Sequence, residues 1–169
     1  MLEVITHLSP HAVTWVLVLF GASITVGNFL GGRLGDWKPM PLVLTGLVLL
    51  IAILLAMPLA MPHLLPAIAL IFVWGLVHFC VIAPLQPRIV EQAKGAPNLA
   101  STLNQGAFNL GNALGASLGG LVLTAGYGYL KLPVASAAVA VVCLLVAMVT
   151  ALVEKRDART TLSLSPSDG

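Results

Sequence analysis

Uncharged polar side chains recur at helical spacing in the carboxyl-terminal half of the chain. Amide groups in an apolar environment need hydrogen-bond partners, so their helix face should point at protein or at a watery cavity. We predict that the amides bind hydroxyls or amides of a small molecule. The alternative is that they only join helices by hydrogen bonds, and each residue then contributes roughly 0.6 to 2 kcal/mol to helix association. The stripe consists of Ser101, Gln105, Asn109 and Asn112, with Asn104 at its margin; cavity lining is preferred for Gln105 and Asn109 and packing for Asn112.

Three further side chains are candidates for the same cavity. Trp74 and His78 stand four residues apart and would present an aromatic surface beside a donor that titrates near neutral pH. The alternative for His78 is a hydrogen bond to a neighbouring helix. Asn28 belongs to a Gly-Asn pair that matches the pair ending at Asn112, so a shared packing role is the alternative to cavity lining.

Other kinds of chemistry lack the residues that they need. No cysteine or carboxylate is spaced to complete a metal site with any of the scattered histidines, which are His7, His11, His63 and His78. We find no nucleophile triad, phosphate-binding loop or nucleic-acid patch. We therefore predict no metal, no cofactor, no nucleic-acid partner and no enzymatic activity.

The composition indicates which elements carry these residues. Hydrophobic residues make up 59% of the chain and charged ones 8%, and the mean hydropathy is +1.02; soluble proteins carry roughly 25% charged residues. Each charge-free stretch is long enough for one or two bilayer crossings, which need about 20 apolar residues each. Residues 154–169 are predicted to be a disordered tail. We predict an all-α integral membrane protein with five transmembrane helices, at residues 12–32, 41–60, 64–84, 99–126 and 133–153.

The basic residues predict how the chain is oriented in the lipid bilayer. Most of them follow the first, third and fifth predicted helices, so these segments should be cytoplasmic. Only Lys131 lies on the opposite side, which places the amino terminus outside and the tail in the cytoplasm. No basic segment precedes the first apolar run, so we expect a retained helix rather than a signal peptide. The basic residues on the cytoplasmic side are Arg33, Lys38, Arg88, Lys94, Lys155, Arg156 and Arg159.

Two stretches of the chain echo each other, each with a Gly-Asn pair followed by glycine at four-residue spacing. Small residues at this spacing let a second backbone approach closely in lipid, so we predict that they pack helices. The echo pairs the first predicted helix with the fourth, which crosses the membrane in the opposite direction. We infer five sixths of a pair of inverted three-helix repeats, whose remaining helix would precede the first. The glycines are Gly27 and Gly31 in one stretch and Gly111, Gly115 and Gly119 in the other.

Two motifs carry a resemblance to a known family. The stretch from Gly27 to Asp36, GNFLGGRLGD, resembles the loop signature of the major facilitator superfamily, and Trp37 and Pro39 depart from the pattern that follows it. Residues 96–101 and 109–115, APNLAS and NLGNALG, resemble the eleventh helix of its drug and sugar efflux permeases of the arabinose-efflux type. The resemblance covers about residues 1–155. It implies a partial six-helix bundle, helices eight to twelve of a twelve-helix transporter, in the cytoplasmic (inner) membrane.

The loop after the first predicted helix carries Gly32, Arg33, Asp36 and Lys38. A carboxylate there can accept charge-assisted hydrogen bonds from a neighbouring helix or from basic side chains. If these bonds form in only one of two bundle arrangements, the loop biases alternating access. The alternative is a solvated turn whose charges only set the topology.

The internal repeat predicts part of a membrane transporter, and the resemblance implies that it exports a small organic solute, such as a sugar or drug, by alternating access. The site of such a transporter forms between repeats, so a missing amino-terminal helix bundle or a partner chain would supply the other wall. No acidic residue lies within any predicted helix, so a proton-coupling carboxylate would also come from that part. The alternative is a truncated membrane protein with a structural or assembly role, or a transporter remnant, that transports nothing.

Overall fold

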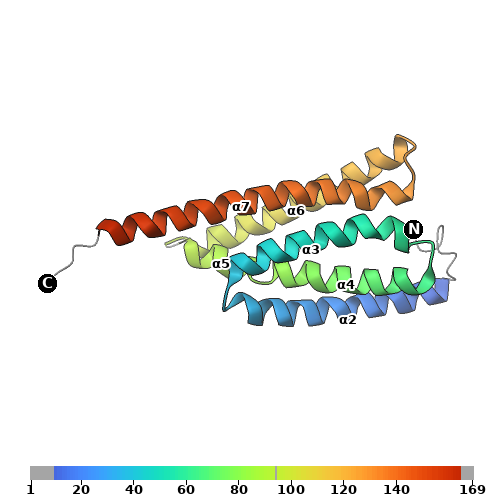
Figure 1. Ribbon diagram of the computed structural model, residues 1–169, viewed down its shortest axis with the longest axis horizontal. Coiled ribbons are helices and arrows are strands. Elements are labelled where there is room, and N and C mark those ends of the chain that lie inside the picture. The colour runs from blue at the N-terminus through green and yellow to red at the C-terminus, as the bar shows by residue number, and fades with distance from the viewer. Residues whose placement is uncertain (1–9, 94, 165–169) are drawn as a thin grey trace.

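The computed structural model describes residues 10–93 and 95–164, and every regular element within these ranges is helical (Figure 1). Five helical segments are long and apolar enough to cross a membrane, so the predicted all-α class with five spans is confirmed. In chain order the elements are α2 (Pro10–Gly35), α3 (Pro39–Ala60), α4 (Leu64–Ile82), α5 (Leu85–Gln92), α6 (Pro97–Thr124), the 3-10 turn η1 (Tyr129–Lys131) and α7 (Leu132–Leu164).

Proline and glycine mark where the helices begin and end. α3 and α6 begin at Pro39 and Pro97, and proline is favoured there because its missing N–H would have no helical partner. Between α6 and η1, Gly126 and Gly128 adopt φ angles of 80° and 73°, a region that glycine reaches without steric cost. These two glycines allow the chain to turn back, so that α7 runs antiparallel to α6 (Figure 1).

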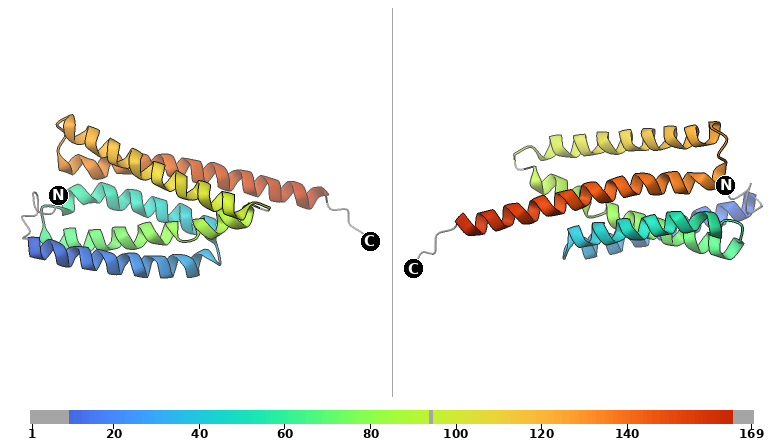
Figure 2. Two further views of the ribbon diagram at one scale, coloured as in Figure 1. Left: turned by 180° about the vertical axis from the view of Figure 1, so that it is seen from behind. Right: turned by 45° about the horizontal axis from the view of Figure 1, so that its top comes forward.

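Two buried apolar clusters hold the centre of the bundle together. α4 packs against both α2 and α3, and α7 lies along α3 (Figures 1 and 2). Trp74 of α4 packs against both clusters, and Ala147 of α7 packs against the first. The first cluster contains Val43, Leu50 and Val81, and the second contains Met57, Met61 and Ala67.

α6 differs from the other long helices because it is largely uncovered. It packs against α5 and α7, and none of its described residues is buried. Its chain runs opposite to that of α2 (Figure 1), which is the direction that an inverted repeat requires. The exposed side chains include large apolar ones such as Leu110 and Leu114, which suits a helix surrounded by lipid or by further protein.

Two segments differ from the prediction. Residues 85–92, expected as loop, form α5, because Pro84 separates a second short helix from α4. The disordered tail predicted from Glu154 is also wrong up to Leu164, since α7 continues to that residue. The segment EKRDARTTLSL is rich in good helix formers, and its next proline comes only at Pro166. Residues 165–169 of the predicted tail lie outside the described residues.

A candidate binding helix and the charged end of the bundle

The predicted amide stripe lies on the uncovered helix. Gln105, Asn109 and Asn112 are exposed, and Asn104 is half-buried. Exposed amides in the apolar part of a membrane would lack partners, so this face of α6 requires either protein or water against it.

The first turns of α6 form a groove with α5. The groove has a volume of about 450 Å³ and includes Ser101 and Asn104 on one side and Gln86 and Glu91 on the other. The structure therefore brings two members of the predicted stripe close to polar side chains of α5. Gln105 and Asn109 do not line this groove.

Asn28 is exposed on α2. α2 and α6 lie on opposite sides of the bundle (Figures 1 and 2). The structure therefore does not bring Asn28 together with the amides of α6, although both belong to the set predicted from the sequence.

The predicted aromatic pair is part of a longer row. Trp74 stacks on Phe20 of α2 with ring centroids 5.4 Å apart and an interplanar angle of 13°. The ring centroid of His78 lies 5.8 Å from that of Trp74, and Phe79 meets His78 edge-on with ring centroids 5.4 Å apart. Both predicted residues are half-buried. One face of Trp74 thus contributes to the contact between α2 and α4.

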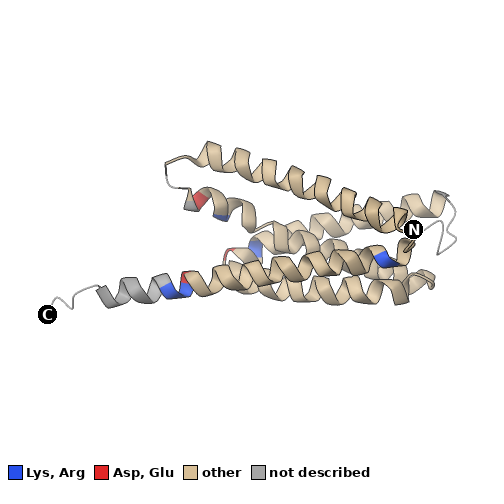
Figure 3. Ribbon diagram, turned by 90° about the horizontal axis from the view of Figure 1, so that it is seen from above, with Lys and Arg blue, Asp and Glu red and all other residues tan. Residues whose placement is uncertain are grey.

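Charged side chains gather at one end of the bundle (Figure 3). Among the described residues, Lys131 in η1 is the only charge at the opposite end. Lys94, which was also predicted to lie with the majority, is outside the described residues. We call this the charged end, and its described members are Arg33, Asp36, Lys38, Arg88, Glu91, Glu154, Lys155 and Arg156.

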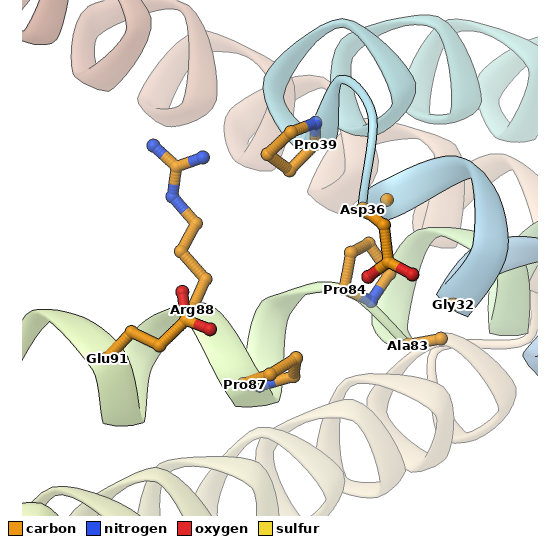
Figure 4. Close-up of a pocket in the computed structure, with 9 residues that line it drawn as sticks. Gly32, Asp36, Pro39, Ala83, Pro84, Pro87, Arg88 and Glu91 are labelled. Carbon is orange, nitrogen blue, oxygen red and sulfur yellow. The ribbon is translucent and has the colours of Figure 1, made fainter.

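A pocket of about 380 Å³ opens at the charged end (Figure 4). The predicted loop contributes Gly32 and Asp36, and α5 contributes Arg88 and Glu91. In Figure 4 the Asp36 carboxylate and the Arg88 guanidinium lie on opposite sides of the hollow. The pocket therefore places a carboxylate and a guanidinium across an open space, in which water or another side chain can lie between them.

Arg88 joins α5 to α7 through an ion pair with Glu154. The side chains of Arg88 and Glu154 are 25% and 37% exposed, so solvent screens the attraction between them. From the sequence alone, Arg88 was predicted only to mark the cytoplasmic side. No local spacing links it with Glu154, which lies 66 residues further along the chain.

The two basic residues of the predicted loop do not line the pocket. The Arg33 guanidinium lies 5.9 Å from the centroid of the Phe29 ring in the same helix, a cation–π geometry. Lys38 is exposed at the start of α3. The structure thus brings together Gly32 and Asp36 of the predicted set and separates Arg33 and Lys38 from them.

The glycines of α2 lie directly against the backbone of α4. A Cβ atom added to Gly27 would lie 3.1 Å from the Cα of Leu76, and one added to Gly31 would lie 2.7 Å from the Cα of Cys80. One turn further on, a Cβ on Gly35 would lie 3.2 Å from Cγ of Pro84. This seam is the close helix contact that small residues at four-residue spacing permit in membranes.

The matching glycines of α6 have open space around them. A Cβ atom on Gly111 or Gly115 would meet no heavy atom within 4 Å, and one on Gly119 would lie 3.7 Å from Cδ2 of Leu132. The neighbouring Asn112 is exposed. The two echoing stretches therefore differ in the structure: α4 covers one, and no described helix covers the other.

The model of the Major Facilitator Superfamily matches residues 1–168 of this chain. The chain belongs to the major facilitator superfamily. The predicted family is thereby confirmed, and with it the assignment of the chain as an integral membrane protein of a transporter family. Within the part of the chain that the structure describes, no three His, Cys, Asp or Glu side chains gather to hold a metal ion.

Several curated members of the superfamily are similar to this chain. The inner membrane transport protein YdhP of Escherichia coli (strain K12) is 44% identical over 151 residues, which are 89% of this chain and 39% of YdhP. The putative transporter AraJ of the same organism is 36% identical over 136 residues, 78% of this chain and 34% of AraJ. A probable sugar efflux transporter of Haemophilus influenzae (strain PittGG) is 30% identical over 118 residues, 70% of this chain and 30% of the relative.

The chain spans about two fifths of the length of YdhP and less of the other two relatives. No solved structure matches the chain.

Proposed function

We propose that this chain forms helices eight to twelve of a membrane transporter that exports a small organic solute by alternating access. The observation that carries the proposal is the match of residues 1–168 to the superfamily, together with coverage of only 39% of YdhP. The antiparallel course of α2 and α6 supports the assignment of the two helices to inverted repeats.

The proposed solute is a sugar or a drug-like molecule with hydroxyl or amide groups. The name of the Haemophilus influenzae relative describes it as a probable sugar efflux transporter. In this chain the exposed amides of Gln105 and Asn109, with Asn104 at the groove, offer donors and acceptors for hydroxyl groups. These amides would face the second helix bundle. The solute would bind between that bundle and α6.

Three other residues are weaker candidates for binding the solute. Trp74 and His78 offer aromatic rings on α4, and Trp74 is stacked on Phe20 of α2. Asn28 would contribute from α2, where its side chain is exposed.

The charged end is proposed to face the cytoplasm across the inner membrane. It holds all the described basic residues except Lys131 (Figure 3), and short cytoplasmic loops carry the excess of Lys and Arg. This orientation puts the start of α2 outside and the end of α7 inside. It also places the pocket of Figure 4 at the cytoplasmic mouth of the bundle.

The pocket at the charged end is proposed to bias alternating access. Asp36 and Arg88 line one open pocket, and Arg88 is paired with Glu154 in this arrangement. In a second arrangement of the bundle the Asp36 carboxylate would pair with a basic side chain, here or on the other bundle. Because such bonds would exist in one state only, they would shift the equilibrium between the two states.

The export proposal is tested by combining the chain with the part of YdhP that precedes its match, in one polypeptide. Cells that produce the combined protein are loaded with labelled sugars or fluorescent drugs, and their efflux is followed. The amino-terminal part alone and the combined protein with Asn109→Ala serve as controls. Efflux that requires this chain and falls with Asn109→Ala supports the proposal. Unchanged retention of every solute, with the protein present in the membrane, favours a structural role that transports nothing.

A further inference from the structure

A groove lies between α3 and α7 at the charged end. It has a volume of about 260 Å³ and is formed by the start of α3 and by the last apolar turn of α7. Its surface joins an apolar floor to a charged rim, because Glu154 and Lys155 directly follow the apolar stretch of α7. We call it the α3–α7 groove, and its lining residues are Met40, Pro41, Leu44, Ala151, Glu154 and Lys155.

The two helices that form this groove have surfaces suited to lipid. Large apolar side chains such as Val48 of α3 and Leu152 of α7 are exposed, and neither helix contains an asparagine or a glutamine. The hydroxyls of Thr45 and Thr150 donate to carbonyl oxygens four residues earlier in their own helices, at 2.8 and 3.0 Å, so they need no partner from outside the helix. These surfaces therefore differ from that of α6, whose amides require protein or water. Lipid is the favoured neighbour of the groove.

The charge at the rim of the groove is positive. Arg88 donates a hydrogen bond to Glu154 and offsets its negative charge. Lys155 lines the groove and is exposed, and Lys38, two residues before Met40, is exposed as well. Long lysine side chains keep their methylene stems in apolar surroundings while their ammonium groups reach the level of the lipid headgroups. Two lysines at that level favour a ligand with a negative charge.

We propose that the α3–α7 groove binds an anionic phospholipid in the leaflet at the charged end. The lipid phosphate lies at Lys155 and Lys38, and one acyl chain runs along Leu44 and Ala151 toward the exposed apolar side chains of the two helices. Charge complementarity selects an anionic lipid over a zwitterionic one, and the apolar floor selects a lipid over free phosphate. The inference goes beyond the proposed function, since it requires a chain that spans the membrane but neither export nor a particular solute.

Native mass spectrometry of the whole chain, released from detergent micelles, tests this site. The protein is titrated with phosphatidylglycerol or with phosphatidylcholine of the same acyl chains, and the fraction that carries one lipid gives each affinity. Lys155→Gln removes the positive charge at the groove, and Lys155→Arg keeps it. Lys131→Gln is the matched control, because it removes the same charge at the opposite end of the bundle. Circular dichroism checks that each variant keeps its helices.

The unaltered chain should bind phosphatidylglycerol at least about fivefold more tightly than phosphatidylcholine. Lys155→Gln should lower the affinity for phosphatidylglycerol about fivefold, which equals ~1 kcal/mol for one basic residue at an anionic headgroup, and should have little effect on phosphatidylcholine. Lys155→Arg and Lys131→Gln should bind both lipids as the unaltered chain does. Glu154→Gln should raise the affinity for phosphatidylglycerol, because it removes a negative charge from the rim.

Equal affinities of the unaltered chain for the two lipids would overturn the proposal. Equal losses from Lys155→Gln and Lys131→Gln would also overturn it and assign the preference to the net charge of the chain. Displacement of the lipid by inorganic phosphate at the same concentration would assign the site to a free anion, and a complex of two chains without bound lipid would assign the groove to a dimer. Because no solute is involved, a failure here is separate from a failure of export.

Discussion

Replacing Gly31 by alanine should weaken the seam between α2 and α4. The new methyl carbon would lie 2.7 Å from the Cα of Cys80 and 2.9 Å from its carbonyl carbon, whereas ordinary carbon contacts are about 3.5 to 4.0 Å. The helices must therefore separate by roughly 1 Å, a gap that removes about a quarter to a half of the dispersion attraction between facing atoms. Overpacking of this kind costs about 1 to 3 kcal/mol.

Gly115→Ala is the matched control for this change. It occupies the corresponding position among the glycines of α6, where the added carbon meets no heavy atom within 4 Å. Both variants gain about 0.5 to 1 kcal/mol of stability because alanine replaces a helical glycine. The difference in stability between them therefore measures the effect on the contact between α2 and α4. We expect Gly31→Ala to be the less stable of the two by about 1 to 3 kcal/mol.

The assay is unfolding of the chain in mixed micelles with increasing dodecyl sulfate, followed by circular dichroism. The free energy of unfolding is compared between the two variants and the unaltered chain. A difference below about 0.5 kcal/mol, the usual effect of a surface substitution, would refute the argument that the α2 glycines are needed for contact with α4. So would a larger loss from Gly115→Ala.

Three further outcomes are expected. Arg88→Gln and Glu154→Gln should each lower the free energy of unfolding by about 0.2 to 1 kcal/mol, and the double variant should lose no more than either one, as a double-mutant cycle would show. In intact cells an impermeant maleimide should label Lys131→Cys, and should label Trp37→Cys only after permeabilisation; the reverse pattern contradicts the orientation. In the complete transporter, Asn109→Ala should lower the export rate about tenfold, the effect of losing ~1.4 kcal/mol of hydrogen bonding, and an unchanged rate at equal protein level removes Asn109 from the site.

The sequence was sufficient to predict the spans, because the charge-free stretches and the prolines between them mark each crossing. It was not sufficient for α5, since a short helix of mixed composition between Pro84 and the glycine turn at Gly95 has no apolar stretch to indicate it. The extension of α7 to Leu164 was missed for a related reason. A polar segment that follows a long helix can continue its hydrogen bonding without adding a buried face.

The candidate site was predicted only in part. Helical spacing placed Gln105 and Asn109 on one stripe, and the structure leaves both exposed. Spacing does not indicate what lies opposite that stripe, and none of the described residues of α6 is buried by another helix. Spacing also linked Trp74 with His78, whereas the stacking of Trp74 on Phe20 is a contact between helices that depends on how α2 and α4 pack.

The glycines of α2 and of α6 also show that the sequence does not indicate which helix face is covered. From the residues alone, Gly27 and Gly111 are equivalent, and both were predicted to pack helices. In the structure α4 lies against Gly27, whereas a Cβ atom on Gly111 would meet no heavy atom within 4 Å. A motif of small residues permits close approach, and the presence of a partner helix decides whether the approach occurs.

The mass of the polypeptide that carries this sequence in its own membranes tests the proposed transporter most directly. A tag after Gly169, introduced at the native locus, allows detection of the product in isolated membranes. For a transporter we expect either a polypeptide of more than twice the 17.5 kDa of this chain, or this chain in a stoichiometric complex with a second helical membrane polypeptide that supplies the other bundle. A product of 17.5 kDa that is free of any such partner would contradict the proposed transporter.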